Sequence, residues 1–151
     1  MKKHISIILI PLMVGVFSHP SFAANEALVK KLKRTKKCNK CDLSGAKLNG
    51  ARLVRARLRK ANLSRAKLRG AKLRRADLRR ANLSRADLSR ANLRSAKLRR
   101  ADLRKANLHR ANFRGADIRG ADFRGARNLK TANFKGAKTK GAIGLPKDIK
   151  T

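Results

Sequence analysis

The chain has few of the residues that usually supply chemistry or stack on nucleic-acid bases. Its 151 residues include no Trp, no Tyr, two Cys, three His and only 8 acidic residues. Without Trp or Tyr, a surface that stacks bases is not expected, which disfavours single-strand and sequence-specific recognition of nucleic acid. Lys and Arg number 42, and the formal net charge is +34. A surface of this sign favours association with polyanions, because binding releases counterions and long-range attraction assists the encounter.

A large apolar residue recurs at every fifth position from Leu43 to Phe123, and Ala or Cys lies two residues before each one. On an α-helix, a step of five residues would rotate successive leucines by about 140° and scatter them around the axis. In an extended chain, residues two apart point the same way, so Ala61 and Leu63 share one side and a bend must precede Ala66. The pattern predicts a solenoid of short strands and bends with Ala and Leu facing inward.

The repeated units resemble those of a known family. Three representative units are Ala61-Asn62-Leu63-Ser64-Arg65, Ala86-Asp87-Leu88-Ser89-Arg90 and Ala116-Asp117-Ile118-Arg119-Gly120. They are similar to the A(D/N)LxX unit of pentapeptide repeat proteins, over about Cys38 to Ala142. The resemblance implies an all-β fold, a right-handed quadrilateral parallel β-helix with four pentads per coil. The best-understood members resemble DNA in shape and acidic charge and inhibit topoisomerases, whereas this chain is strongly basic and is not expected to mimic DNA.

Residues 1–23 have the pattern of a secretory signal peptide. Two lysines precede an apolar stretch from Ile5 to Phe17, and Ser21-Phe22-Ala23 places small residues at the −3 and −1 positions. The apolar stretch is short for a membrane span, although an uncleaved anchor is the alternative. We therefore expect a mature chain that begins at Ala24 and is exported, to the periplasm or the medium.

Residues 24–37 are predicted to form a short basic helix. Asn25 is placed as its N-cap and Glu26 in its first turn, while Leu28, Val29 and Leu32 fall on one side. This apolar stripe predicts a capping helix, because the first coil of a solenoid has unpaired strand edges and an apolar end. The alternative is a helix that lies on a membrane surface, since lysines and arginines surround the stripe.

Cys38 and Cys41 occupy inward positions of the repeat. Buried thiols that close the first coil and a disulfide both fit these positions, and the spacing alone does not guarantee disulfide geometry. A redox pair or a metal site fits less well. A zinc site needs more ligands, and the mature chain offers only His109, far along the sequence. We expect no structural metal and no cofactor.

If four pentads form one coil, residues twenty apart stack and the outward charges fall into columns. The most basic corner combines two columns, which are Arg59, Arg79, Arg99, Arg119 and, beside it, Lys60, Arg80, Arg100. A third, shorter column is Arg74, Arg94, Arg114. A fourth alternates in sign and is expected to neutralise itself through pairs between coils, namely Arg57, Asp77, Lys97, Asp117.

The corner of seven cations is the predicted anion-binding surface. Like charges about 4.8 Å apart repel by roughly 0.9 kcal/mol in water before salt screening. A bound row of anions would remove that repulsion, and guanidinium groups suit phosphate and carboxylate. The alternative is that these arginines are simply splayed and solvated.

Catalysis has little support, because the outward positions carry Asn, Asp, Ser, Lys and Arg on a regular lattice on which no concave pocket is expected. His109 is predicted to be an ordinary solvated side chain, and the aspartates take the position at which the family motif places Asp or Asn. We predict a non-enzymatic scaffold whose partner is lipopolysaccharide, an acidic glycan, duplex DNA or an anionic membrane surface. Two alternatives stay open: a structural or protein-interaction module without a polyanion ligand, and a membrane-active cationic protein.

The repeat changes near its C-terminal end. After Phe123 the pattern slips by one residue near Arg127-Asn128, which predicts a local bulge or loop. The lattice is predicted to cover residues 38–144, and residues 145–151 are predicted to form a short tail. That tail or a second subunit is expected to cover the last coil, so a homodimer through the solenoid end stays open.

Overall fold

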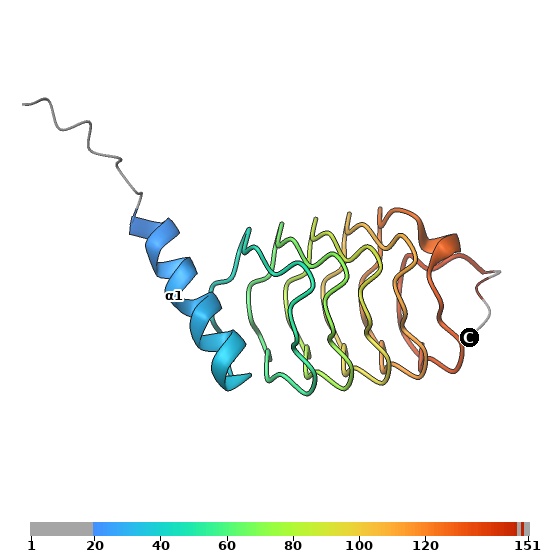
Figure 1. Ribbon diagram of the computed structural model, residues 1–151. Helices are drawn as coiled ribbons and strands as arrows, with labels where there is room; N and C mark the ends of the chain where they lie inside the picture. The colour runs from blue at the N-terminus through green and yellow to red at the C-terminus, as the bar shows by residue number, and fades with distance from the viewer. Residues whose placement is uncertain (1–19, 148, 150–151) are drawn as a thin grey trace, which may run out of the picture.

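Helix α1 (Pro20–Thr35) is followed by a solenoid whose coils stack along one axis (Figure 1). The computed structural model describes residues 20–147 and 149, and the side chains from residue 25 onward. Most of the predicted signal peptide, residues 1–19, lies outside the described residues. In the described ranges, no helix is both long and apolar enough to span a bilayer.

Each pentad consists of an extended residue and a β-turn. The backbone N–H of the inward Ala donates to the carbonyl of the central residue three positions earlier, as from Ala61 to Leu58 at 3.1 Å. The residue before that Ala has a positive φ, for example +57° at Arg65. The extended parts are so short that they form isolated bridges rather than the short strands expected, because the turn occupies the rest of each pentad.

Four such turns complete one coil. Parallel bridges join residues twenty apart, beginning with Lys37↔Arg57 and continuing to Asn107↔Arg127. This spacing confirms the predicted four pentads per coil and gives the solenoid four sides. Residues that share a column therefore lie directly above one another, about 4.8 Å apart.

The inward positions are as predicted. Central residues from Leu43 to Phe123 are fully buried, and the alanines between Ala46 and Ala121 are at most 7% exposed. Phe113 and Phe134 stack in consecutive coils with ring centroids 4.9 Å apart, and Phe123 packs edge-on against both. All three rings are thus taken up by the core.

One extra residue enters after Arg127, where the sequence predicted a bulge or loop. Asn128 has a φ of +61°, and the 3-10 helix η1 (Leu129–Thr131) follows it. The next bridges join residues twenty-one apart, as in Asn112↔Asn133. The short helix absorbs the insertion at one corner, so the core continues through Phe134.

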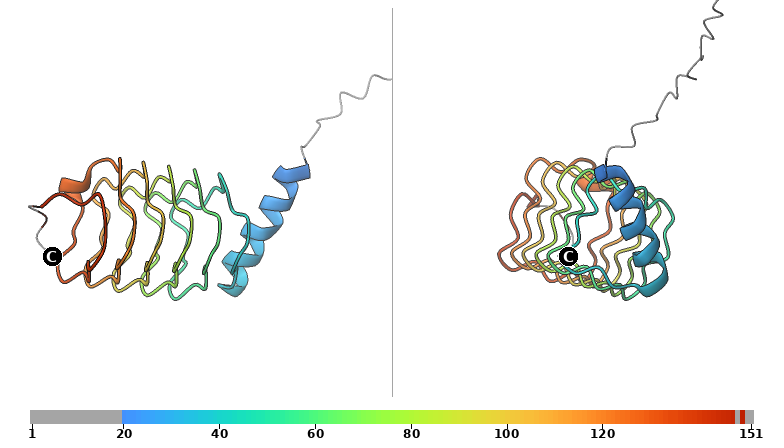
Figure 2. Two further views of the ribbon diagram at one scale, coloured as in Figure 1. Left: turned by 180° about the vertical axis from the view of Figure 1, so that it is seen from behind. Right: turned by 90° about the vertical axis from the view of Figure 1, so that its left-hand side faces the viewer.

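Helix α1 lies across the N-terminal end of the solenoid, as the two views of Figure 2 show. Leu32 is fully buried, and Leu28 and Val29 pack against the core. The predicted start at Ala24 is wrong, because the helix begins at Pro20, a residue favoured in the first helical turn. Asn25 is therefore no N-cap and Glu26 is not in the first turn. Instead, the Asn25 side-chain amide donates to the Ser44 carbonyl at 2.7 Å.

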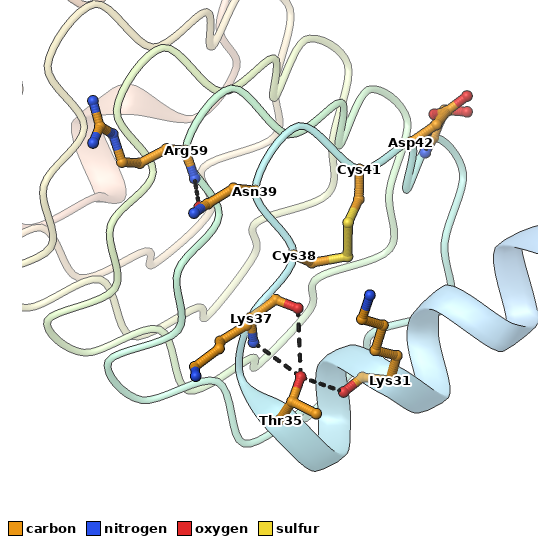
Figure 3. The surroundings of a disulfide bond; sticks show 9 residues. Lys31, Thr35, Lys37, Cys38, Asn39, Cys41, Asp42 and Arg59 are labelled. Atoms are coloured by element: carbon orange, nitrogen blue, oxygen red, sulfur yellow. Dashed lines mark hydrogen bonds between the residues drawn. A yellow bond between two sulfur atoms is a disulfide. The ribbon is translucent and has the colours of Figure 1, made fainter.

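A disulfide joins Cys38 and Cys41 in the first coil (Figure 3), with Cα atoms 5.4 Å apart. Cys38 is buried, but Cys41 is only half-buried, although the lattice predicted that both point inward. No earlier coil covers the first one, and α1 shields only part of its end. The two cysteines close the first turn of the solenoid.

Candidate anion-binding site

Six of the seven cations predicted to bind anions lie together in the structure. They line an open hollow of about 250 Å³ that spans three consecutive coils: Arg59, Lys60, Arg79, Arg80, Arg99 and Arg100. Arg119 continues the column in the next coil but does not line the hollow. We call these seven residues the basic corner.

Backbone hydrogen bonds determine the register of the basic corner. The N–H of Lys60 donates to the carbonyl of Arg79 at 3.0 Å, and the N–H of Arg80 donates to that of Arg99 at the same distance. The N–H of Arg100 likewise donates to the carbonyl of Arg119 at 2.9 Å. Because a continuous ladder of backbone hydrogen bonds stacks these residues, their backbone positions form straight rows along the solenoid axis.

The second column of the corner places cations where the backbone is strained for ordinary residues. Lys60, Arg80 and Arg100 have φ values of +56° to +57°. This third position of a turn favours Gly or Asn, and an L-residue there costs roughly 1 kcal/mol. The same conformation recurs at this position of nearly every pentad, as at Arg65, Arg75 and Arg85, so it belongs to the repeat and does not distinguish the corner. In three coils the corner therefore carries a second cation at a position that costs backbone energy, and in the fourth coil Gly120 takes this position.

Two arginines of the corner are neutralised by aspartates of their own turns. The Arg79 guanidinium donates from Nε to Asp77 Oδ1 at 2.7 Å and from Nη2 to Asp77 Oδ2 at 2.5 Å. Arg119 contacts Asp117 in the same way, at 2.8 Å for both contacts. The expectation that Asp77 and Asp117 would pair between coils with their column neighbours is wrong.

The geometry of the turn explains this difference. Asp77 Oδ1 also accepts the backbone N–H of Arg79 at 3.3 Å, which holds the carboxylate over the turn and beside the arginine two residues later. The Asp-x-Arg spacing was the available sequence signal, since all four such segments form the pair. The other two are Asp102–Arg104 and Asp122–Arg124, on the neighbouring corner.

The remaining arginines of the first column are free. Arg59 and Arg99 are exposed and form no ion pair with any residue that the structure describes. The backbone N–H of Arg59 donates to Asn39 Oδ1 at 2.9 Å (Figure 3). That of Arg99 has no acceptor within the described part of the chain, because Lys97 replaces the Asp or Asn that accepts it in other turns.

The ion pairs keep the aspartates of the corner charged. Burial alone opposes ionisation of Asp77, but hydrogen bonds from the Arg79 side chain and backbone outweigh it and lower the pKa of the carboxyl. For Asp117, the hydrogen bond from the Arg119 side chain is the main cause of the lowered pKa. The pKa of Asp102 is lowered as well, because burial, which opposes the shift, is outweighed by hydrogen bonds from Arg104. The hydrogen bond from the Arg124 side chain is the main cause of the lowered pKa of Asp122.

Acid is therefore expected to destabilise the fold through these four aspartates. A carboxyl whose pKa is lower in the folded chain stabilises that chain above the unfolded value of about 3.9, and this contribution is lost as the pH falls through the folded pKa. We expect the urea midpoint to fall steadily below about pH 4. A variant with Asn at all four positions keeps the side-chain oxygen that accepts the turn N–H, and should show less than half of this decline. An equal decline in both proteins would contradict the assignment.

Other residues considered for chemistry lie apart. His109 is half-buried on a different corner, in the column of Arg69 and Ser89. In the described ranges, no three His, Cys, Asp or Glu side chains gather closely enough to hold a metal ion. The expectation of no concave pocket is wrong, because a second hollow of about 1060 Å³ lies between α1 and the first coil. It opens because the N-terminal part of α1 diverges from the solenoid (Figure 1).

Known proteins share the repeat. The family model described as pentapeptide repeats matches in eight copies, over residues 37–75, 61–100, 71–110 and 91–127. A pentapeptide repeat protein from the cyanobacterium Cyanothece 51142 is 28% identical, with 78% of this chain and 97% of that chain covered and a TM-score of 0.40. One from the Arabidopsis thaliana thylakoid lumen is 32% identical, with 78% and 72% covered and a TM-score of 0.28.

A third structure shows likeness in fold alone. QnrB1, a plasmid-mediated fluoroquinolone resistance protein, is 23% identical over 70% of this chain and 68% of that chain, with a TM-score of 0.57. Among curated proteins there is no significant sequence match.

Proposed function

The chain belongs to the pentapeptide repeat family, whose members form right-handed β-helices, and from this premise we propose that it is a non-enzymatic scaffold that binds an anionic polymer. The observation that carries the proposal is the hollow lined by six cations and by no residue of another kind. The pattern of residues 1–23 supports the further proposal that the protein is exported, to the periplasm or the medium.

Binding at the basic corner would be electrostatic and based on shape. Each coil adds one or two cations to the rows, so a polymer with many anionic groups binds several cations at once and releases several counterions. Guanidinium groups donate in a planar fork that matches phosphate and carboxylate. A compact monovalent anion would bind only one such group and is not the ligand proposed.

Among the side chains that the structure describes, no aromatic ring is exposed, and this limits the mode of recognition. Phe113, Phe123 and Phe134 are at most 2% exposed, and the sequence has no Trp or Tyr. Stacking on bases is not available to such a surface. The proposed partners are therefore recognised through their acidic groups, as in lipopolysaccharide, an acidic glycan, the backbone of duplex DNA or an anionic membrane surface.

Replacing the first column by glutamine is expected to weaken binding about tenfold or more at moderate salt. The variant is Arg59/Arg79/Arg99/Arg119→Gln, compared with wild type on heparin, lipopolysaccharide, a short DNA duplex and anionic vesicles. On DNA, the slope of log K against log salt should flatten by about 0.9 for each phosphate that the variant no longer neutralises. Fluorescence anisotropy across a salt titration measures both quantities.

The chain offers a matched control on another corner. Four cations stack there one per coil, so their replacement by glutamine removes the same charge: Arg74, Arg94, Arg114 and Lys135. We expect this control to retain binding within about threefold, because only long-range attraction is reduced. Equal losses in both variants would show that net charge, and not the basic corner, determines binding. Weak binding of every probe, unchanged in both variants, would leave the structural or protein-interaction module as the function.

A further inference from the structure

The basic corner has a period of two coils. At the strand position beside the first column, the parallel bridges stack Arg57, Asp77, Lys97 and Asp117 in that order. A coil with a cation at this position has a free arginine in the column, and a coil with an aspartate there has a paired one. The backbone positions of Arg59 and Arg99, whose guanidinium groups are free, are therefore two coil spacings apart, about 9.6 Å.

The charge of successive coils follows the same alternation. The coil of Arg59 presents three positive side chains at the corner, namely Arg57, Arg59 and Lys60. The next coil has Arg79 held by Asp77 and only Arg80 free. The third again presents three positive side chains, Lys97, Arg99 and Arg100, and the fourth has Arg119 held by Asp117 beside Gly120. Positive charge is thus concentrated in every second coil.

The coil of Arg99 adds a backbone donor to this pattern. The backbone N–H of Arg99 has no acceptor among the residues described, and the guanidinium of the same residue is unpaired. Lys97 accounts for both features, because an aspartate in its place would accept the N–H and pair with the arginine, as Asp77 does for Arg79. Lys97 therefore leaves both the side chain and the backbone N–H of Arg99 available to an anion.

A ligand that matches this corner is straight, runs along the solenoid axis and carries its acidic groups two coil spacings apart. An extended β-linked polysaccharide is straight, and one disaccharide has nearly this length. If every second sugar is acidic, the acids face Arg59 and Arg99 while neutral sugars pass Asp77. Duplex DNA fits less well, because its strands wind away within a turn of about 34 Å and its charge is uniform along the axis. Lipid headgroups have no fixed spacing.

We propose that the basic corner binds a linear acidic polysaccharide with an acidic group on alternate sugars, aligned with the solenoid axis. The inference rests on the proposed function, because it names the ligand class of the same site. It also assigns the roles of the side chains: Arg59 and Arg99 bind the acidic groups, the second column adds general attraction, and Arg79 and Arg119 contribute little.

The test compares two double variants with equal loss of charge, Arg59→Gln/Arg99→Gln and Arg79→Gln/Arg119→Gln. The probes are hyaluronan oligosaccharides, acidic at alternate sugars, and oligogalacturonate, acidic at every sugar. For hyaluronan we expect the first variant to bind about tenfold more weakly than wild type and the second to stay within about threefold. Since long-range attraction falls equally in both, the difference reports direct binding by Arg59 and Arg99. Equal losses in the two variants would overturn the inference.

A third variant, Asp77→Asn/Asp117→Asn, removes the alternation between free and paired arginines and preserves the turns. Asn keeps the side-chain oxygen that accepts the turn N–H, as Asn62 and Asn82 do for Ser64 and Ser84 at 3.1 and 3.0 Å. Arg79 and Arg119 then become free. We expect oligogalacturonate to gain affinity by a larger factor than hyaluronan, because only the former has acids to meet the additional arginines. Equal gains would count against the two-coil period.

Failure of the inference and failure of the proposed function are distinguishable. If wild type binds duplex DNA or vesicles through the basic corner but discriminates neither between the two saccharides nor between the two arginine pairs, the inference falls and the proposed function stands. If the four-glutamine variant of the first column binds every probe as wild type does, the proposed function falls as well.

Discussion

Replacing Leu83 with Ala is expected to lower the free energy of unfolding by about 2–5 kcal/mol. Leu83 is fully buried near the middle of the solenoid, with Leu63 and Leu103 in the same column one coil away on either side. Its N–H donates to the carbonyl of Asp102 at 2.7 Å, and the N–H of Leu63 donates to that of Asn82 at 2.7 Å. These ladder bonds hold the coils at a constant spacing, so neighbouring side chains cannot collapse into the cavity.

Urea unfolding followed by circular dichroism measures this effect. Arg85→Ala is the matched control, because Arg85 is exposed and lies in the turn that follows Leu83. The control keeps a non-glycine residue at a φ of +58°, and its stability should change by no more than about 0.5 kcal/mol. A small loss in Leu83→Ala, similar to that of the control, would mean that the stacked leucines are not the main source of stability.

Replacing Leu32 with Asp is expected to detach α1 from the first coil. Leu32 is the one α1 residue among those with described side chains that is fully buried. A carboxylate there would lose its hydration with no partner for its charge, which costs more than undocking the helix. Undocking exposes the apolar end and the unpaired backbone of the first coil, and such edges associate. Trypsin cleavage after Lys30, Lys31 and Lys33 should accelerate about tenfold, since cleavage follows the open population.

Ala27→Asp provides the control, because Ala27 lies on the exposed face of the same helix and acquires the same charge. We expect it to leave the cleavage rate close to that of wild type. Analytical ultracentrifugation should then show self-association of Leu32→Asp alone. Identical cleavage and sedimentation of the two variants would contradict the role of α1 as a capping helix and favour a helix that lies on a membrane surface.

Much of the architecture was predictable because each pentad repeats the same spacing of inward-facing residues. Alanine and leucine at a spacing of two and then three residues can share one side only if the chain turns after each leucine. The inward positions and the insertion near Asn128 follow from that constraint, whereas the number of pentads per coil, and with it the columns, was implied by the resemblance to the repeat family. The start of α1 did not follow, because Asn25 is a good N-cap residue by type, and only packing shows that its amide reaches Ser44.

The alternation within the basic corner was the main feature that column membership did not predict. A column places Asp77 beside Arg57 and Lys97 and suggests pairs between coils. The structure instead shows that a turn N–H holds the carboxylate over its own turn, where Arg79 is the nearest cation. The ion pair therefore forms within one turn rather than between stacked coils, and the same applies to Asp117 and Arg119.

The sequence by itself determined which residues face inward and where the repeat slips, and the resemblance of its pentads to a known family supplied the number of pentads per coil and hence which cations share a corner. These features depend on periodicity, since backbone hydrogen bonds between coils form only when every coil has the same length and the same inward side. The tertiary structure decided which of those cations are free, how the disulfide and α1 close the N-terminal coil, and where the hollow lies. These depend on distances of a few ångströms between particular side chains and the turns beneath them, which no repeat pattern specifies.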